Sequence, residues 1–186
     1  EGTSISTCVA LTVQQGGHAL YVLNLDSASR TFVYDYKTDL WVEWETAAGG
    51  AKWPIVAACQ HSNALIVQHA TNGWLYVMSP TIYQDDTVNF TVLMRLGRVD
   101  FGTNQYKFVR SLDILGDIQS STTNVSLQYS NDDWTTLSTA RTLDMSLSRV
   151  FATNLGMFRR RSFQISYAGN NPLRIEAVEL RLKLGE

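Results

Sequence analysis

The chain has 186 residues, of which 45% are hydrophobic and 17% charged, and its formal net charge at pH 7 is −2. This length suffices for one large or two small globular domains with a buried core. The small negative charge argues against a general DNA- or membrane-binding protein, because such proteins are usually basic. No apolar run approaches the roughly 20 residues that a membrane-spanning helix needs, so we expect no membrane partner.

The candidate strands are short and alternate apolar with polar residues, and turn-like pieces separate them. In chain order they are "ALYVLNL", "TFVYDY", "LWVEWE", "PIVAAC", "ALIVQH", "WLYVMS", "VNFTVLMR", "KFVRSLDIL", "NVSLQYS", "RSFQISY" and "EAVELRLKL". In the last one, Val178, Leu180, Leu182 and Leu184 share one face. Almost nothing is typical of a helix. The sequence therefore predicts an all-β, antiparallel fold.

A weak repeat organises the first part of the chain. "ALYVLNL" at 19–25 resembles "WLYVMSP" at 74–80, and units of about 40–55 residues with three or four strands are typical of β-propeller blades. Residues 1–102 are therefore predicted to form about two propeller-like blades. Two blades cannot close a ring, so the others would lie on further chain or on partner subunits.

The repeat stops at "DFGTN", and we place a domain boundary near Gly102. Residues 103–186 hold six or seven predicted strands without that periodicity, which favours a C-terminal β-sandwich. We expect each domain to have its own core. The first core is expected to contain Tyr21, Val22, Leu75 and Tyr76. The second is expected to contain Trp134, Phe163, Ile165 and the four apolar residues of the last strand.

The cysteines and histidines suggest no site. Cys8 and Cys59 lack a disulfide or metal spacing and lie in apolar strands, so we expect buried free thiols, made in a reducing compartment. A metal site would require His61 and His69 to meet across a hairpin, and neither His18 nor another residue is an apparent third ligand.

Two hairpins carry polar side chains suited to turns. In "VYDYKTDLW" at 33–41, Asp35 and Thr38 can hydrogen-bond the turn while Trp41 covers the returning strand. The alternative is a sugar-stacking platform of Trp41, Trp44 and Trp53.

The second hairpin is "SNDDWTTL" at 130–137, which resembles an Asp-box turn: Asp132 ties down the hairpin and Trp134 fills the core. Calcium binding by Asp132 and Asp133 is a weaker alternative, because further spaced oxygen ligands are missing.

Nothing in the sequence indicates an enzyme. It contains no P-loop, GxSxG, HExxH or evident Ser–His–Asp set, so we expect no catalytic residue and no cofactor. A glycosidase of propeller type ranks low, because no acid–nucleophile pair is apparent.

Three consecutive arginines occur in "LGMFRRRSFQISYAG" at 155–169. In an extended strand Arg159 and Arg161 share the face of Phe163, and Arg160 takes the wetter one. We expect Arg161 to be buried, with its head on a carboxylate or on backbone carbonyls, and Arg160 to be exposed. Phosphate binding is a weaker alternative, because a wider basic patch is not evident.

The C-terminal half resembles the tail-hub proteins of short-tailed bacteriophages, also called packaged-DNA stabilisation proteins or tail accessory factors. Their pattern runs from a Ser-x-Asp-x-x-Trp hairpin to Leu-Gly-x-x-Arg-x-Arg-x-Phe-x-Ile. It falls here on Ser130, Asp132, Leu155, Gly156, Arg159, Arg161, Phe163 and Ile165, and on Trp134, which stands one residue closer to Asp132 than the pattern has it. "VYDYKTDLW" is similar to their Tyr-Asp-x-x-Thr-x-x-Trp blades. This chain lacks the usual glycine after Asp132 and a tryptophan before Leu155.

The resemblance implies a structural virion protein of the tail, made in the host cytoplasm. Such proteins form a homo-oligomeric ring, by this resemblance a hexamer, below the portal or adaptor ring. The ring retains the packaged DNA, with at most non-specific contact, and anchors tail needle or fibre proteins. The alternative function is a carbohydrate-binding propeller and sandwich module that recognises a receptor through Trp41, Trp44 or Trp53.

Overall fold

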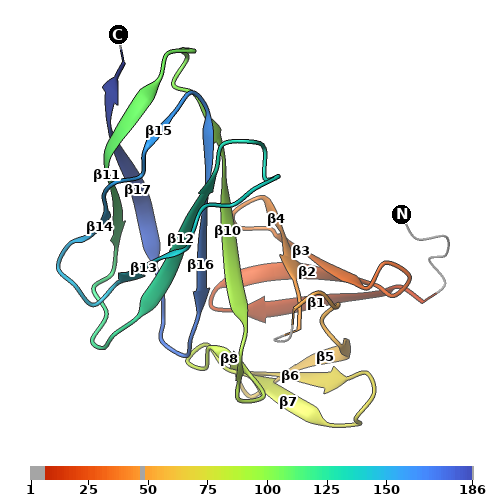
Figure 1. Cartoon of the computed structure of the whole chain (residues 1–186). Helices are drawn as coiled ribbons and strands as arrows, with labels where there is room; N and C mark the ends of the chain where they lie inside the picture. Colours follow the sequence, from red (N-terminus) through yellow and green to blue (C-terminus); the bar gives the residue numbers. More distant parts are fainter. Residues whose placement is uncertain (1–6, 47–48, 186) are drawn as a thin grey trace. The chain divides into compact units, whose positions relative to one another are not determined.

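The computed structural model describes residues 7–46 and 49–185. Within this part of the chain every regular element is a β-strand, strands make up 58% of the residues, and no helix is present (Figure 1). Consequently no helix there is long and apolar enough to cross a membrane. The strands form several antiparallel sheets, none of them closed. The predicted all-β, antiparallel class is therefore confirmed.

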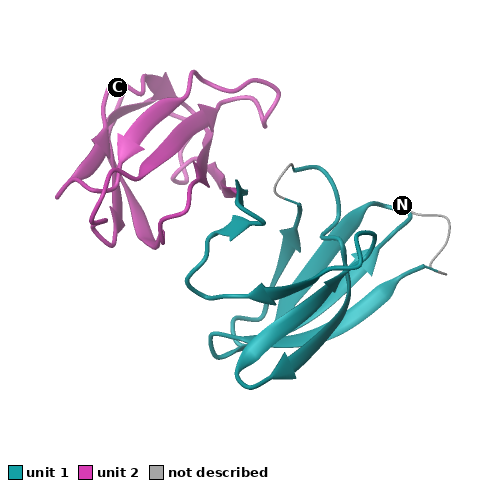
Figure 2. Ribbon diagram, turned by 90° about the horizontal axis from the view of Figure 1, so that it is seen from below, with its two compact units in different colours: residues 1–90 teal, residues 91–186 magenta. Residues whose placement is uncertain are grey.

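The chain divides into two compact units between Phe90 and Thr91 (Figure 2). The sequence placed the boundary near Gly102 instead. The difference arises because β10 (Thr91–Val99) pairs with β16 (Arg161–Ala168), with Thr91 opposite Ala168. A strand belongs to the sheet that completes its hydrogen bonds, so β10 is part of the second unit. The "DFGTN" cue is a turn inside that unit, where Phe101 and Gly102 have positive φ angles.

The first unit contains two sheets in which consecutive strands are neighbours. One sheet has the order β1 (Val9–Gln15), β2 (His18–Leu25), β3 (Arg30–Asp35), β4 (Leu40–Trp44). The other has the order β5 (Ile55–His61), β6 (Ala64–His69), β7 (Leu75–Met78), and a small ladder of β8 (Gln84–Asp85) and β9 (Val88–Asn89) follows. Two-residue turns join β1 to β2 and β5 to β6. All four turn residues have positive φ, which suits the twist of a tight hairpin.

The Leu-Tyr-Val repeat does not mark equivalent strands. Its first copy lies in β2, the second strand of its sheet, and its second copy lies in β7, the third strand of the other sheet. What recurs in the structure is the meander of hairpins. A three-residue apolar match is too short to fix strand position, because any half-buried strand favours such residues.

Each sheet of the first unit contributes one face to a shared core. The buried members are Val13, Val22, Val33, Ile55, Leu65 and Val67. A buried network joins the same two sheets. Thr31 (0% exposed) donates to Asn24 (2% exposed) and accepts from Trp53 N at 2.9 Å, while Asn24 Nδ2 donates to Ile55 O at 2.6 Å.

The second unit has two sheets around one core. The first has the order β10–β16–β12 (Asn124–Ser130)–β13 (Arg141–Asp144). In the second, β11 (Lys107–Gly116) pairs on one side with β14 (Val150–Ala152) and β15 (Met157–Phe158), and also with β17 (Ile175–Leu184). Both sheets supply core residues, among them Leu112 and Val150 from one and Val125 and Ile165 from the other.

The two cores are separate, as expected, but some of their members differ from the prediction. Val178, Leu180 and Leu182 pack with Phe163 and Ile165, whereas Leu184 is exposed at the end of its strand and Trp134 lies outside the cluster. In the first unit Val22 and Tyr76 belong to the core, but their neighbours Tyr21 and Leu75 do not. Adjacent residues of a strand point to opposite faces, so one of each pair had to be misassigned.

Replacing Thr31 with Val should destabilise the first unit by about 1–3 kcal/mol, because Asn24 and the Trp53 amide would each lose a buried partner. Urea unfolding followed by tryptophan fluorescence measures this change. Thr12→Val is the matched control, since Thr12 is an exposed strand residue of β1. Equal stability of the two variants would contradict a stabilising role for the network.

Candidate functional site

Arg161 is the first residue of β16, and its side chain is enclosed within the second unit, with 1% of its surface exposed. Its Nη1 donates to Leu155 O at 2.6 Å, its Nη2 to Met157 O at 3.1 Å and its Nε to Asn131 Oδ1 at 2.8 Å. The guanidinium also stacks on two rings, with its Cζ 3.8 Å from the centre of Tyr129 and 4.6 Å from that of Phe158.

These contacts explain how a charge is tolerated at this depth. Burial lowers the pKa of Arg161 to about 10, so the group still carries its charge at neutral pH. Its hydrogen bonds end on neutral oxygens, and the two aromatic faces supply further favourable electrostatics. The prediction that Arg161 is buried and bonded to backbone carbonyls, while Arg160 is exposed, is confirmed.

Arg159 does not share the environment of Arg161. β16 begins only at Arg161, and residues 159–160 form a bend between β15 and β16, which belong to different sheets. Arg159 is exposed, and its guanidinium lies 4.6 Å from the centre of the Tyr106 ring. The predicted common face of Arg159 and Arg161 is therefore wrong, because the strand does not extend that far.

Lys107 is a second buried cation, which the sequence analysis missed. It is 0% exposed, and its Nζ donates to Thr103 O, Gln105 O and Arg159 O at 2.6, 2.9 and 2.8 Å. The Nζ also lies 5.9 Å from the centre of Phe158, the ring that stacks on Arg161. Strand alternation contained the signal, since Lys107 shares its parity with buried Val109. Lys107 fixes the loop before β11 against the backbone of Arg159.

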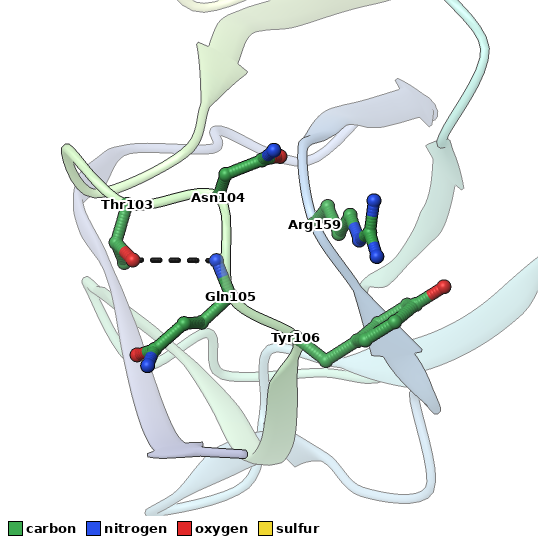
Figure 3. Close-up of a pocket in the computed structure, with 5 residues that line it drawn as sticks. All are labelled: Thr103, Asn104, Gln105, Tyr106 and Arg159. Atoms are coloured by element: carbon green, nitrogen blue, oxygen red, sulfur yellow. Dashed lines mark hydrogen bonds between the residues drawn. The ribbon is translucent and has the colours of Figure 1, made fainter. Parts of the chain in front are cut away.

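A shallow depression of about 580 Å³ lies above this anchored loop, lined by Thr103, Asn104, Gln105, Tyr106 and Arg159 (Figure 3). The Gln105 amide donates to Thr103 Oγ1 at 3.2 Å, which closes the loop. Figure 3 shows the Arg159 guanidinium beside the Tyr106 ring. The depression thus places an aromatic ring and a cation side by side at the surface.

The Asp132 turn forms as predicted. Its carboxylate accepts hydrogen bonds from Thr136 Oγ1 at 2.6 Å, Thr136 N at 2.9 Å and Ser130 Oγ at 2.8 Å. The bonds from Thr136, followed by the one from Ser130, lower the pKa of Asp132 to about 2. Since its oxygens already hold the turn, the carboxylate has a structural role.

Trp134 lies at the surface end of the same turn. Its backbone N donates to Ser130 Oγ at 2.9 Å, and the Arg95 guanidinium lies 5.0 Å from its ring centre. The expectation that Trp134 fills the core is therefore wrong. Asp133 and Trp134 both have positive φ, 55° and 72°, and this backbone path leaves the indole half-buried against Arg95.

The first-unit hairpin uses Asp35 in the expected way. Its carboxylate accepts from Lys37 N at 2.9 Å, from Thr38 Oγ1 at 2.8 Å and contacts His18 Nδ1 at 2.7 Å. Burial raises the pKa of Asp35, but the hydrogen bonds from Lys37, Thr38 and His18 outweigh it and lower the pKa to about 2.

The predicted platform of three tryptophans does not form. Trp41 is 57% exposed and packs beside Tyr34, with ring centres 5.1 Å apart. Trp44, three residues later in β4, lies edge-on to Trp53 at 5.1 Å, and both pack on the first core. Because residues 41 and 44 differ in parity, their side chains leave β4 on opposite faces.

The histidines and cysteines are dispersed. In the β5–β6 hairpin His61 pairs beside the turn and His69 at the far end, opposite Ile55, so they do not meet. Among the described residues no three His, Cys, Asp or Glu side chains gather as a metal site. Cys8 and Cys59 are free thiols, but Cys59 is exposed rather than buried, because it lies on the outer face of β5.

No family model matches the chain, and no curated protein matches it.

Arg161→Ala should lower the free energy of unfolding of the second unit by about 2–4 kcal/mol, because the carbonyls of Leu155 and Met157 lose their donor and two rings lose their packing partner. Arg160→Ala is the matched control and should stay within about 0.5 kcal/mol of the parent. Chemical denaturation of both variants tests this. Equal midpoints would show that the Arg161 contacts add nothing to stability.

The Asp132 turn predicts a pH dependence. An unfolded aspartate titrates near about pH 4, so between about pH 4 and pH 2 the unfolded state binds more protons and stability falls as the pH is lowered. Asp132→Asn should flatten this fall, and Thr136→Val should weaken it. Thr139→Val, an exposed threonine nearby, is the control. Denaturation midpoints across this pH range provide the measurement, and an unchanged slope in Asp132→Asn would contradict the prediction.

Proposed function

We propose that this chain is a structural virion protein, a subunit of a phage tail hub or nozzle that attaches below the portal, retains packaged DNA and anchors other tail parts. In this proposal the first unit contributes two blades of β-propeller type and the second unit is a β-sandwich. The subunits form a homo-oligomeric ring. The protein carries out no catalysis.

The observation that carries the proposal is the convergence of the hub pattern on Arg161. The pattern has two separate parts, the 130–134 hairpin and the 155–165 segment. Arg161 connects them, since it donates to Asn131 within the hairpin and to Leu155 and Met157 within the segment. Leu155, Phe163 and Ile165 are all buried in the same core. The contacts between the two parts of the pattern support the proposal more strongly than the sequence match alone.

The glycine positions of the pattern also bear on the proposal. Asp133 occupies the position where the hub pattern has glycine, and its φ is 55°. Glycine adopts this left-handed conformation without steric cost, so the backbone here has the shape that the pattern's glycine suits. Gly156 has a φ of 69°, a conformation that favours the glycine of Leu-Gly.

The arrangement of the two sheets in the first unit supports the proposal that they are propeller blades. Each sheet is a meander, and a single core fills the space between their facing sides. Apolar side chains also occupy the opposite faces: Trp41 on β4, and Leu75 and Val77 on β7, are exposed. Sheets that are apolar on both faces suit a radial arrangement in which each has a neighbour on either side.

A carbohydrate-binding module is the second candidate, and exposed Trp41 beside Tyr34 is the observation that favours it. Trp44 and Trp53 give it no support, because they pack on the core.

Native mass spectrometry of the full-length product distinguishes the two candidates. A hub subunit is expected to assemble into a discrete ring of several copies, six by the resemblance, and to ignore sugars. A monomer that binds glycans, and loses that binding in Trp41→Ala, would contradict the hub and favour the carbohydrate-binding module.

A further inference from the structure

The two units carry opposite charge, which the net charge of the whole chain conceals. Residues 1–90 hold three Lys and Arg against eight Asp and Glu, whereas residues 91–186 hold twelve against nine. The second unit is therefore basic, with an excess of three positive charges. Two of its cations, Lys107 and Arg161, are buried, and the remainder lie at its surface or rim.

Strand register places much of this surface charge on one face. Cross-strand partners share a face, and Leu112 and Ile114 of β11 point into the core. Phe108 is paired with Met157 and Lys183, and Ser111 with Arg181, on the outward side. We call this outward side of β11, β14, β15 and β17 the basic face.

Five cations lie on or beside the basic face: Arg110, Arg149, Arg159, Arg181 and Lys183. Arg110 is exposed at the β-bulge of β11. Two of the others are held against aromatic rings, with the Arg149 Cζ 4.9 Å from Phe151 and the Arg159 Cζ 4.6 Å from Tyr106. The Nε and Nη2 of Arg149 already bind Asp113, whereas the Arg159 guanidinium has its plane fixed by Tyr106 and can present its N–H edge to an oxyanion.

Two carboxylates offset part of this charge. Asp113 is buried beneath the face and accepts from Arg149 at 2.8 Å, with Arg181 at 3.8 Å. Glu179 is exposed opposite Asp113. The face keeps an excess of about three positive charges, spread over the roughly 23 Å that separate Tyr106 from Asp113 in an extended strand.

We infer that the basic face binds the phosphate backbone of DNA. A DNA strand presents a phosphate about every 3.4 Å along the helix axis, so each cation along the face can meet one. The exposed Phe108, Phe151 and Met157 lie on the same face as these cations. Because recognition is through phosphates, the binding has no sequence preference. This inference rests on the proposed function in naming DNA as the natural ligand.

The test is fluorescence anisotropy of the full chain with a labelled 20-base-pair duplex at two salt concentrations. With about three phosphates neutralised, the affinity should fall roughly 40-fold between 50 and 200 mM salt. The double variant Arg110→Ala/Lys183→Ala removes two of these contacts and should reduce that salt effect to about 3-fold.

The matched control is Arg98→Ala/Arg174→Ala, which removes the same charge from the same unit. Those arginines lie beside Asp133 and Glu176 instead. Equal loss of binding in both double variants would overturn the inference, since only net charge would then matter. Competition by a polyglutamate peptide as strong as that by DNA would also overturn it and would favour an acidic protein partner.

Native mass spectrometry of the same variants separates this inference from the hub proposal. A ring that assembles normally but shows no salt-dependent DNA binding would overturn the basic face alone. A ring that dissociates in Arg110→Ala/Lys183→Ala, with DNA binding unchanged, would identify the face as a contact between copies and would also overturn the inference.

Discussion

The second unit depends on how two buried cations are stabilised by hydrogen bonds to neutral oxygens, without a carboxylate. Arg161 and Lys107 both lie near the Phe158 ring, and between them they bind five backbone carbonyls and one side-chain amide. Carbonyl oxygens have fixed positions once their strands are paired. The cations therefore hold three irregular segments, the loop before β11, the 130–134 hairpin and the 155–160 connection, in one arrangement.

Backbone carbonyls and a carboxylate differ as acceptors for a buried cation. A buried carboxylate would carry its own desolvation cost and would move with its side chain. Because the acceptors are backbone carbonyls, the two cations can make their hydrogen bonds only when β15, β16 and the loops are all in their native positions. Lys107 also fixes the backbone of Arg159 by binding its carbonyl oxygen, while the Arg159 guanidinium stacks on Tyr106 at the surface.

Strand alternation predicted the fold class, the burial of Arg161 and the inward face of β17, because each depends on a few neighbouring residues. Strand alternation gave wrong predictions where contacts between residues distant in sequence decide which unit or core a residue belongs to. β10 belongs to the second unit because β16 completes its ladder, and no local cue at "DFGTN" reports that pairing. Trp134 was assigned to the core by its size, whereas the positive φ angles of the turn direct it toward Arg95.

The net charge of the whole chain describes neither unit. The formal charge of −2 averages an acidic unit and a basic one, and an electrostatic surface is a property of a domain. Alternation in "ELRLKL" places Arg181 and Lys183 on one side of the last strand. Only the pairing of β11 with β17 brings that side beside Arg110.

Strand pairing also sets the order in which the chain acquires structure as it leaves the ribosome. In the first unit each strand of a meander pairs with the next, so its sheets need only local contacts and can form during synthesis. In the second unit β11 must wait for β17, and β10 for β16, so neither sheet is complete until the last strands have been translated. During that interval the apolar sides of β10 and β11 have no cover. This nascent stage is where chaperones are most needed and where premature association between neighbouring chains is most easily started.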